Sequence, residues 1–483
     1  MNKTQLMQKA GIPAIPGYVP TMPVTKVKNT LTLTPEEMVS EYGNVQRFLK
    51  KYGSRIMFDH GANVWFIWNG KYWQKDTQQL VLKFALEIGR DINAEADKLT
   101  DLKQKDSVKK WGKQSMGLAK CVNLLKLACA YMPSDEDQFD NNGYLLNVDN
   151  VAIDLRTGKP KPHSKDDYCT KIAPVIYDKA AKCPVWLAVL NTLFESKQDL
   201  ITYFQKVIGY SLTADISEKC FFILWGPGGN NGKTMIINLL RDILGTGYCV
   251  TIAPETLMSK KPQGSIRTDL QRLKHNYRIG ATSETDEKYR FNSSIIKNLT
   301  GKDVITARTI YAKDDEFSID FKLFIATNPM PDFNLDDKAL MSRVRIIPFM
   351  YTVPTPDTTL PDRLCEEMSG ILNWAIEGCL MWQKERLGAV PGANELPVEV
   401  HQESTVKLFI DECCEVGDNF MATTTALYER YTKFHLEVSD GSSLVSLKAF
   451  CSELDTCGFY DVDHKRDANY RVGIKIKVSD RAE

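Results

Sequence analysis

The sequence has no surplus of either charge and no long apolar run. Its 483 residues include 61 Lys and Arg and 61 Asp and Glu, so the formal net charge is zero. Overall charge therefore points to neither a nucleic-acid nor a membrane partner, and any basic surface must be local. No apolar stretch approaches the roughly 20 residues that span a bilayer, and the first residues lack the apolar core of a secretory signal. We expect no membrane partner.

Cysteine and histidine are present, but without the spacing of metal sites. The twelve cysteines are scattered, none forms a Cys-x-x-Cys pair, and the six histidines are dispersed. Cys451 and Cys457 have no histidine pair at finger spacing. We predict buried, reduced thiols without structural zinc, which fits a cytoplasmic protein.

Composition and local patterns divide the chain into four parts. Hydrophobic residues are 43% and charged residues 25%, as in ordinary globular proteins, and the length suits about three domains. Residues 1–37 are proline-containing and aperiodic, which predicts a flexible tail. Residues 38–183 mix helical patterns with short strands and predict an N-terminal α+β domain. Residues 184–390 predict an α/β core with a following helical segment, and 396–483 a small C-terminal domain.

The run from Phe221 to Thr234 predicts a phosphate-binding loop. An apolar strand leads into a glycine-rich loop that ends in Gly-Lys-Thr, and a helical pattern comes next. The loop N–H groups and the helix N-terminus surround a polyphosphate, the lysine meets its oxygens, and the threonine hydroxyl can ligate Mg²⁺. The residues predicted to bind ATP are Gly228, Gly229, Asn230, Asn231, Gly232, Lys233 and Thr234.

This loop departs from the usual spacing by one residue. Pro227 stands where a glycine is usual, five positions before the Gly of Gly-Lys-Thr, and Gly226 lies one residue further back. We therefore predict a loop lengthened by one residue. A glycine turn without function is the alternative, and the order of strand, loop and helix argues against it.

Two later strands end in polar residues that suit hydrolysis. Residues 277–283 read as a strand that delivers Glu284, which we expect on the strand adjacent to the phosphate loop, orienting Mg²⁺ or the attacking water. Residues 321–327 read as an apolar strand that ends at Asn328, whose amide could hold that water against the γ-phosphate.

Arg343 and Arg345 lead into a further apolar strand. Such arginines could reach the γ-phosphate of a neighbouring subunit and stabilise transition-state charge, typically by ~10³–10⁵ in rate. This use requires an oligomer. A surface salt bridge is the alternative for Arg343.

The alternation of residue types along residues 302–319 predicts two strands that are joined by a turn near residues 313–315. A hairpin inserted before the strand of Asn328 would project from the core and, in a ring, into the central channel. Its basic and aromatic groups could then grip DNA independently of base sequence.

The last 85 or so residues predict three helices, at 403–415, 424–436 and 444–457. A strand pair at 459–463 and 469–478 comes after them, with Lys465 and Arg466 in its turn. This order is similar to a winged-helix module, in which a helix enters the major groove and the wing contacts phosphate. A structural lid is the competing interpretation. The lysine-rich helix predicted at about 104–131 also allows two: a solvated face or a DNA contact.

Together the motifs resemble superfamily three helicases of the phage, plasmid and poxvirus primase-helicase type, especially replication initiator helicases of mobile elements such as staphylococcal pathogenicity islands. The resemblance covers about residues 38–480. It rests on residues 145–148, 153–158 and 183–186, the phosphate loop, residues 300–303 with 306–308, and residues 326–329.

The resemblance implies a multidomain α/β protein. Its parts are a central AAA+ P-loop core with a parallel sheet, an α+β N-terminal domain and a winged-helix-like C-terminal domain. It further implies a homo-hexameric ring that moves on single-stranded DNA by hydrolysing ATP and binds a duplex origin through the C-terminal domain. By the same resemblance, the residues serving ATP and Mg²⁺ are Lys233, Thr234, Glu284 and Asn328, with Thr234 and Glu284 at the metal, Arg343 acting from the next subunit and Arg345 beside it. The DNA-binding residues would be Lys302, Arg308, Tyr311 and Lys313 on the channel hairpin and Lys465 and Arg466 on the wing.

The expected function is therefore an ATP-driven replicative DNA helicase and replication initiator of a mobile genetic element. Two alternatives stay open: an initiator scaffold whose assembly alone depends on ATP, and a primase-helicase with a diverged polymerising site in residues 38–185. Many relatives carry a primase domain before the helicase, whereas only the proline-containing tail precedes the matching region here, so we expect no intrinsic primase.

Overall fold

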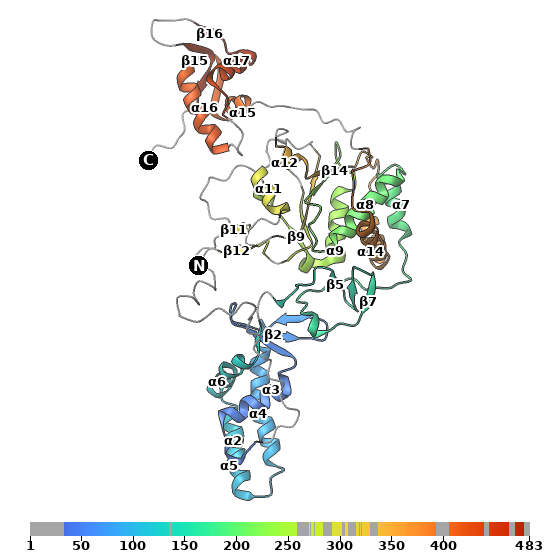
Figure 1. Ribbon diagram of the computed structural model, residues 1–483, viewed down its shortest axis with the longest axis vertical. Helices are drawn as coiled ribbons and strands as arrows, with labels where there is room; N and C mark the ends of the chain where they lie inside the picture. Colours follow the sequence, from blue (N-terminus) through green and yellow to red (C-terminus); the bar gives the residue numbers. More distant parts are fainter. Residues whose placement is uncertain are drawn as a thin grey trace, which may run out of the picture. The chain divides into compact units, whose positions relative to one another are not determined.

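The computed structural model describes residues 33–134, 138–257, 270, 272–274, 276–283, 292–301, 305–307, 315–317, 319, 321–328, 337–392, 405–438, 444–462 and 469–477. By their contacts they divide into two units (Figure 1). Unit 1 runs to Asn141 and includes Ser164–Thr170, while unit 2 comprises Asn142–His163 and the chain from Lys171 onward. Residues 142–163 and 171–183, which the sequence had placed in the N-terminal domain, thus pack with the core.

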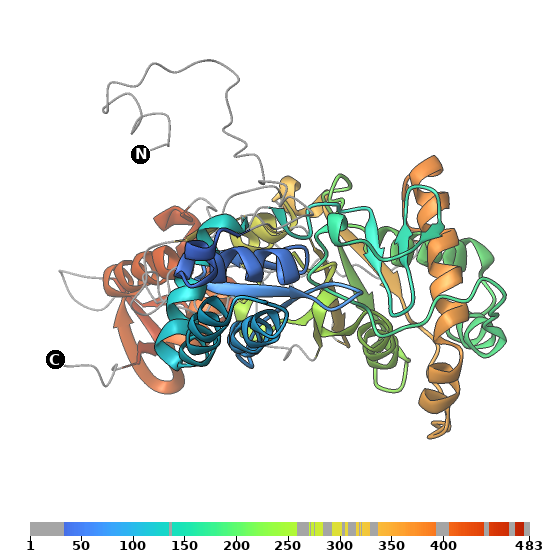
Figure 2. The ribbon, with the colours of Figure 1, turned by 90° about the horizontal axis from the view of Figure 1, so that it is seen from below.

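Unit 1 is built from helices that pack side by side and a small sheet (Figure 2). The sheet order is β3-β2-β1-β4, and β4 alone is parallel to its neighbour. Phe48, Ala85 and Leu124 meet in its core. The helices are α2 (Pro35–Met38), α3 (Glu41–Tyr52), α4 (Leu80–Ala96), α5 (Leu102–Ser115) and α6 (Leu118–Ala128), and the strands are β1 (Ile56–Asp59), β2 (Val64–Trp68), β3 (Trp73–Lys75) and β4 (Pro133–Ser134).

The prediction of a single helix at 104–131 is wrong in one respect. The chain forms two helices, α5 and α6, which are separated at Met116 and Gly117 because Gly117 takes an extended conformation at the N-cap of α6. Two of its lysines, Lys105 and Lys109, lie 3.7 and 2.7 Å from the carboxylate of Asp97. That pairing occupies part of the basic face that the sequence had left open to DNA.

Unit 2 contains a five-stranded parallel sheet in the order β14-β8-β13-β10-β9, which confirms the predicted α/β core. Its strands are β8 (Phe221–Trp225), β9 (Cys249–Thr251), β10 (Ile279–Ser283), β13 (Lys322–Thr327) and β14 (Val344–Pro348). One expectation fails: β10, which precedes Glu284, is not adjacent to β8. The strand of Asn328, β13, lies between them.

Helices cover both faces of this sheet, so β8 is buried along its whole length and reads as a continuous apolar run. Phe222 and Leu224 pack in one cluster with α9, whereas Ile223 packs in the other with α11 and α12. The helices on the α9 side are α7 (Pro184–Leu193), α8 (Gln198–Ser211), α9 (Lys233–Tyr248) and α14 (Met368–Glu385); on the other side lie α11 (Ser293–Thr300) and α12 (Lys338–Met341).

Two glycines let α8 and α14 cross with their backbones in contact. A Cβ on Gly209 would lie 2.0 Å from Cys379 N, and one on Gly378 would lie 2.0 Å from Gln205 O. No larger residue fits at either position without moving a helix.

Shorter elements complete unit 2. They are β5 (Leu145–Asn147), β6 (Ala152–Asp154) and β7 (Lys159–Lys161) in an antiparallel sheet, α13 (Leu360–Glu366), and the hairpin of β11 (Ile305–Ala307) and β12 (Asp315–Phe317). The predicted hairpin is therefore confirmed, with one difference at its turn. Asp315 belongs to β12, where it pairs with Ala307 of β11, and so it does not lie in the turn. Short 3₁₀ turns occur at Cys129–Tyr131 and Lys165–Asp167 in unit 1 and at Pro254–Thr256 in unit 2.

The C-terminal residues of unit 2 have a core of their own, in which Phe409, Tyr431, Phe450 and Ile474 meet. The three predicted helices are present, as α15 (Thr405–Cys413), α16 (Thr424–Val438) and α17 (Leu447–Thr456), and so are β16 (Asp461–Val462) and β17 (Tyr470–Ile476). The sequence did not reveal β15 (Cys414–Thr423), which pairs with β17 in the order β15-β17-β16. In the part of the chain that the structure describes, no helix is long and apolar enough to cross a membrane.

Candidate functional site

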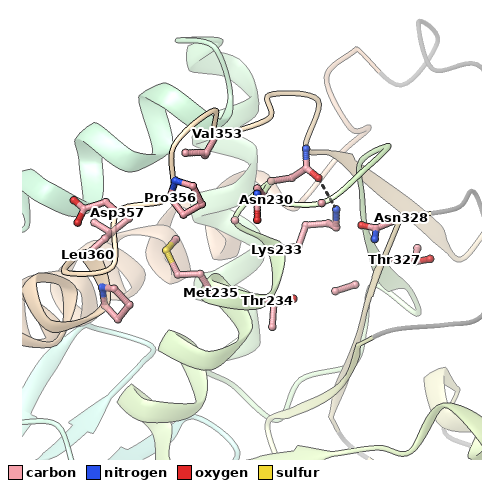
Figure 3. Close-up of a pocket in the computed structure, with 15 residues that line it drawn as sticks. Asn230, Lys233, Thr234, Met235, Thr327, Asn328, Val353, Pro356, Asp357 and Leu360 are labelled. Atoms are coloured by element: carbon pink, nitrogen blue, oxygen red, sulfur yellow. Dashed lines mark hydrogen bonds between the residues drawn. The ribbon is translucent and has the colours of Figure 1, made fainter.

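A cavity of about 540 Å³ opens at the carboxyl ends of β8 and β13 (Figure 3). β8 is followed by α9 on one face of the sheet, and β13 by α12 on the other. In open α/β sheets, ligands bind outside the strand ends where successive connections turn to opposite faces. The cavity is lined by residues 229–235 and 326–328 and by Val353, Pro356, Asp357, Leu360 and Pro361.

Residues with and without a positive φ alternate along the loop before α9. Gly228, Asn230 and Gly232 have φ of 83°, 58° and 80°, whereas Gly229 and Asn231 are not among the residues with positive φ. Such alternation turns successive N–H groups toward one side and forms a nest for anions. Glycine adopts this conformation without cost and asparagine tolerates it, which explains the composition of the loop.

Lys233 begins α9 at the base of this loop, with only 6% of its surface exposed. Its Nζ donates to Gly226 O and to Asn231 Oδ1, both at 3.1 Å, the latter bond dashed in Figure 3. Both acceptors are neutral, and burial lowers the pKa of Lys233. A buried ammonium without an anion is poorly stabilised, so an incoming phosphate would improve its surroundings.

Asn231 also fixes the loop to residues 351–353, which come after β14. Its Nδ2 donates to Tyr351 O at 3.0 Å and to Thr352 Oγ1 at 3.2 Å. Beside it, Val353 N donates to Asn230 O at 3.0 Å. Asn230 and Asn231 therefore link the loop to the segment 351–353, whose Val353 lines the other side of the cavity.

Gly226, the displaced glycine, serves packing. A Cβ there would lie 2.1 Å from Phe349 O. Phe349 N in turn donates to Trp225 O at 2.6 Å. This backbone approach requires glycine at 226, whereas Gly229 borders open space.

The cavity has a polar end and an apolar end. Asn328 comes directly after β13 and lies on the side of Lys233, with Thr234 at the start of α9 below (Figure 3). The opposite end is lined mainly by Met235, Val353, Pro356 and Leu360, with Asp357 beside them. The structure thus brings the predicted phosphate loop and Asn328 to one site. The sequence missed the second wall, residues 353–361, which carries no motif beyond a proline-rich turn after the last strand.

Arg343 and Arg345 do not line this cavity. Arg343 Nη1 donates to Lys297 O at 2.7 Å and to Thr300 Oγ1 at 3.0 Å, at the end of α11. Arg345 Nη1 donates to the carbonyls of Ser342 and Val344, both at 2.9 Å. The two guanidinium groups thus have separate partners. Among the described residues, neither forms a salt bridge, which was the alternative for Arg343.

Several predicted site residues lie outside the described residues. They are Glu284, the residue immediately after β10, Lys302, Arg308, Tyr311 and Lys313 of the hairpin region, and Lys465 and Arg466. Their roles stay predictions.

Residues 45–195 match the protein family described as "D5 N terminal like". Among curated proteins, "Putative helicase 022R" of Frog virus 3 (isolate Goorha) is 29% identical over 232 residues, which cover 44% of this chain and 24% of the relative. "Putative helicase L207/L206" of Acanthamoeba polyphaga mimivirus is 27% identical over 224 residues, or 46% of this chain and 23% of the relative. "Putative primase C962R" of African swine fever virus (isolate Tick/Malawi/Lil 20-1/1983) is 25% identical over 201 residues, or 39% and 20%.

The chain thus covers about a quarter of the length of the two viral helicase relatives named above. Over that part it is a distant homologue of them. Among solved structures, the apo structure of the NrS-1 C terminal region (305-718) aligns with a TM-score of 0.40 and 10% identity, covering 87% of this chain and 96% of that chain.

Proposed function

We propose that this protein is an ATP hydrolase that acts on DNA in replication. In this proposal it is a replicative helicase and initiator of a mobile genetic element, working as a homo-hexameric ring. The observation that carries the proposal is the convergence of the phosphate loop, Lys233 and Asn328 on one cavity at the switch point of a parallel sheet. The distant homology to viral proteins named helicases and primases supports the choice of nucleic acid as the second substrate.

ATP would lie along the cavity with its polyphosphate against the loop N–H groups and Lys233. The base would lie at the apolar end, between Met235, Val353 and Leu360. The volume of about 540 Å³ suits a ligand of this size. Mg²⁺, when bound with ATP, neutralises charge on the β and γ oxygens, and the Thr234 hydroxyl and Glu284 are the residues proposed to hold it.

Hydrolysis needs a positioned water. Asn328 is exposed at the polar end of the cavity, where its amide can hold a water against the γ-phosphate. Glu284, one residue beyond β10, is proposed as the carboxylate that orients the water or the metal. Because β10 is the neighbour of β13, Glu284 and Asn328 come at the ends of adjacent strands.

Arg343 is proposed to act on the nucleotide of an adjacent subunit. It does not line the cavity of its own chain, so a role at a nucleotide requires a second copy. The same requirement motivates the homo-hexamer. Arg345 is proposed beside it in a supporting role.

DNA would be held in two places. Lys302, Arg308, Tyr311 and Lys313, in and around the β11–β12 hairpin, would contact a single strand in the channel. The C-terminal part has its helices and strands in the order helix, strand, helix, helix, strand, strand with the sheet β15-β17-β16. This arrangement supports a winged-helix-like module, whose wing residues Lys465 and Arg466 would contact a duplex origin.

The test is unwinding of a forked duplex with ATP. Four chains are compared: the parent, Glu284→Gln, Lys313→Ala and Arg343→Ala. Glu284→Gln should bind ATP and assemble but neither hydrolyse nor unwind. Lys313→Ala should hydrolyse ATP without unwinding, and Arg343→Ala should lose both activities. A parent protein that hydrolyses ATP but never separates strands would instead support the initiator scaffold, and template-dependent primer synthesis would support the primase-helicase.

A further inference from the structure

The last turn of α11 holds the Arg343 side chain. Lys297 O, in that turn, accepts from Gly301 N at 2.8 Å, and a carbonyl oxygen has a second lone pair for a further donor. Arg343 Nη1 supplies that donor, at 2.7 Å from Lys297 O, and it also reaches Thr300 Oγ1 at 3.0 Å. Thr300 is 3% exposed, and its hydroxyl donates to Ile296 O at 2.7 Å. This bond within α11 fixes the direction from which Thr300 Oγ1 can accept a hydrogen bond. One guanidinium nitrogen is therefore fixed by two acceptors.

A second link fixes the chain segment that carries Arg343. Lys297 Nζ lies 2.8 Å from Asp337 Oδ2, and both side chains are partly buried. The other oxygen of Asp337 accepts from Leu340 N at 3.0 Å and caps α12. Since α12 ends just before Arg343, the segment from 337 to 343 is tied to α11 at both ends, each time through Lys297.

The rest of the guanidinium is left available. Among the described residues, Arg343 Nε and Nη2 have no hydrogen-bond partner, and the side chain is half-buried. An arginine presents its donors in a planar fork that matches two phosphate oxygens. Holding Nη1 therefore orients the edge formed by Nε and Nη2 without occupying it.

We propose that Thr300, Lys297 and Asp337 are positioning residues, which pre-orient Arg343 so that its Nε–Nη2 edge takes a phosphate of the neighbouring subunit's nucleotide. This inference rests on the proposed function of Arg343 and adds how the arginine is prepared for it. A long side chain that is already ordered loses less freedom when it binds, so pre-orientation favours the transition state. Neither Thr300 nor Asp337 touches the nucleotide.

The first experiment compares Thr300→Val with Thr300→Ser. Valine fills the same buried space but removes the acceptor, whereas serine keeps it. We expect Thr300→Val to lower kcat for ATP hydrolysis about tenfold, the effect of losing one hydrogen bond to a charged group. KM for ATP should stay unchanged, and Thr300→Ser should retain nearly the parental kcat. An equal loss in both variants, or a rise in KM that matches the fall in kcat, would overturn the proposal.

Asp337→Asn provides an independent test. The amide oxygen still caps α12, but the ion pair with Lys297 is lost. A fall in kcat with unchanged KM and an unchanged thermal unfolding midpoint is expected. A lower midpoint with normal kcat would show that the pair serves only stability.

A double-mutant cycle separates this inference from the proposed function beneath it. If Arg343→Ala abolishes hydrolysis to the same residual rate with or without Thr300→Val, Thr300 acts through Arg343. If Thr300→Val costs the same factor in the Arg343→Ala background, the positioning role is refuted while the role of Arg343 stands. If Arg343→Ala leaves kcat unchanged, the proposed function of Arg343 fails, and the positioning role fails with it.

Discussion

Replacing Asn231 by aspartate should weaken ATP binding strongly, because the change places a carboxylate where the loop holds Lys233. In the parent, Asn231 Oδ1 accepts from Lys233 Nζ at 3.1 Å, and the side chain is 2% exposed. A carboxylate would hold the lysine more tightly than the amide does. It would also face any phosphate that Lys233 binds.

The magnitude can be worked from the geometry. A phosphate oxygen held by Lys233 would lie roughly 5 Å from the new carboxylate, since each is about 3 Å from Nζ and the N–H bonds of an ammonium diverge tetrahedrally. At an effective dielectric constant of about 20, two unit charges at that separation repel by about 3 kcal/mol. Asn231→Asp should therefore raise the dissociation constant for ATP by about a hundredfold or more. Asn231→Ala removes the hydrogen bonds without adding charge and should cost about tenfold.

The assay is equilibrium binding of a slowly hydrolysed ATP analogue with Mg²⁺, by titration calorimetry. Thermal unfolding without nucleotide serves as control, since both variants lose the Asn231 Nδ2 bonds to Tyr351 O and Thr352 Oγ1. If Asn231→Asp binds within twofold of the parent, the assigned path of the polyphosphate past Lys233 is wrong. If alanine weakens binding as much as aspartate, the loss comes from the broken link to the segment 351–353 and charge is not its cause.

Three further predictions concern the same unit. Burial lowers the pKa of Lys233 from its ordinary 10.5, and a bound polyphosphate should raise it again. At an alkaline pH that lies above the pKa of Lys233 in the free protein and below its pKa with ATP bound, ATP binding should therefore take up protons. Calorimetry in buffers of different ionisation enthalpy would show this uptake, and Lys233→Arg should abolish it. Gly226→Ala should lower the free energy of unfolding by about 1–3 kcal/mol through the clash with Phe349 O, whereas Gly229→Ala, which borders open space, should change it little. Gly378→Ala should also lower the thermal unfolding midpoint, because its Cβ would lie 2.0 Å from Gln205 O; an unchanged midpoint would mean that α8 and α14 are not in backbone contact.

The features that the sequence predicted well are local. Buried parallel strands such as β8 and β13 are short apolar runs, and the glycine-rich signature after β8 predicts a phosphate loop at that strand's carboxyl end. Asn328 could be placed because it stands immediately after such a run. β15 escaped because Gly417 interrupts its alternation and its register shifts between Val416 and Met421.

The features that the sequence did not predict depend on contacts between distant residues. The order of the strands, which puts β13 between β8 and β10, is not encoded in any one segment. The second wall of the cavity begins at Val353, far along the chain from the loop that it closes. The hold of α11 on Arg343 joins a helix carbonyl to a side chain 46 positions later. Neither partner has a pattern that reveals the pairing.

The division into units has a consequence for how this chain can be cut or exchanged. The chain passes between the units at 141/142, at 163/164 and again at 170/171. The segment 164–170 supplies backbone acceptors to the buried Trp73, whose N donates to Cys169 O at 2.7 Å and whose Nε1 donates to Lys165 O at 2.8 Å. A fragment that stops at residue 141 would therefore leave a buried tryptophan without acceptors. A chimaera with a single junction cannot contain unit 1 alone. A fragment that keeps unit 1 intact must contain residues 33–170, even though residues 142–163 belong to unit 2.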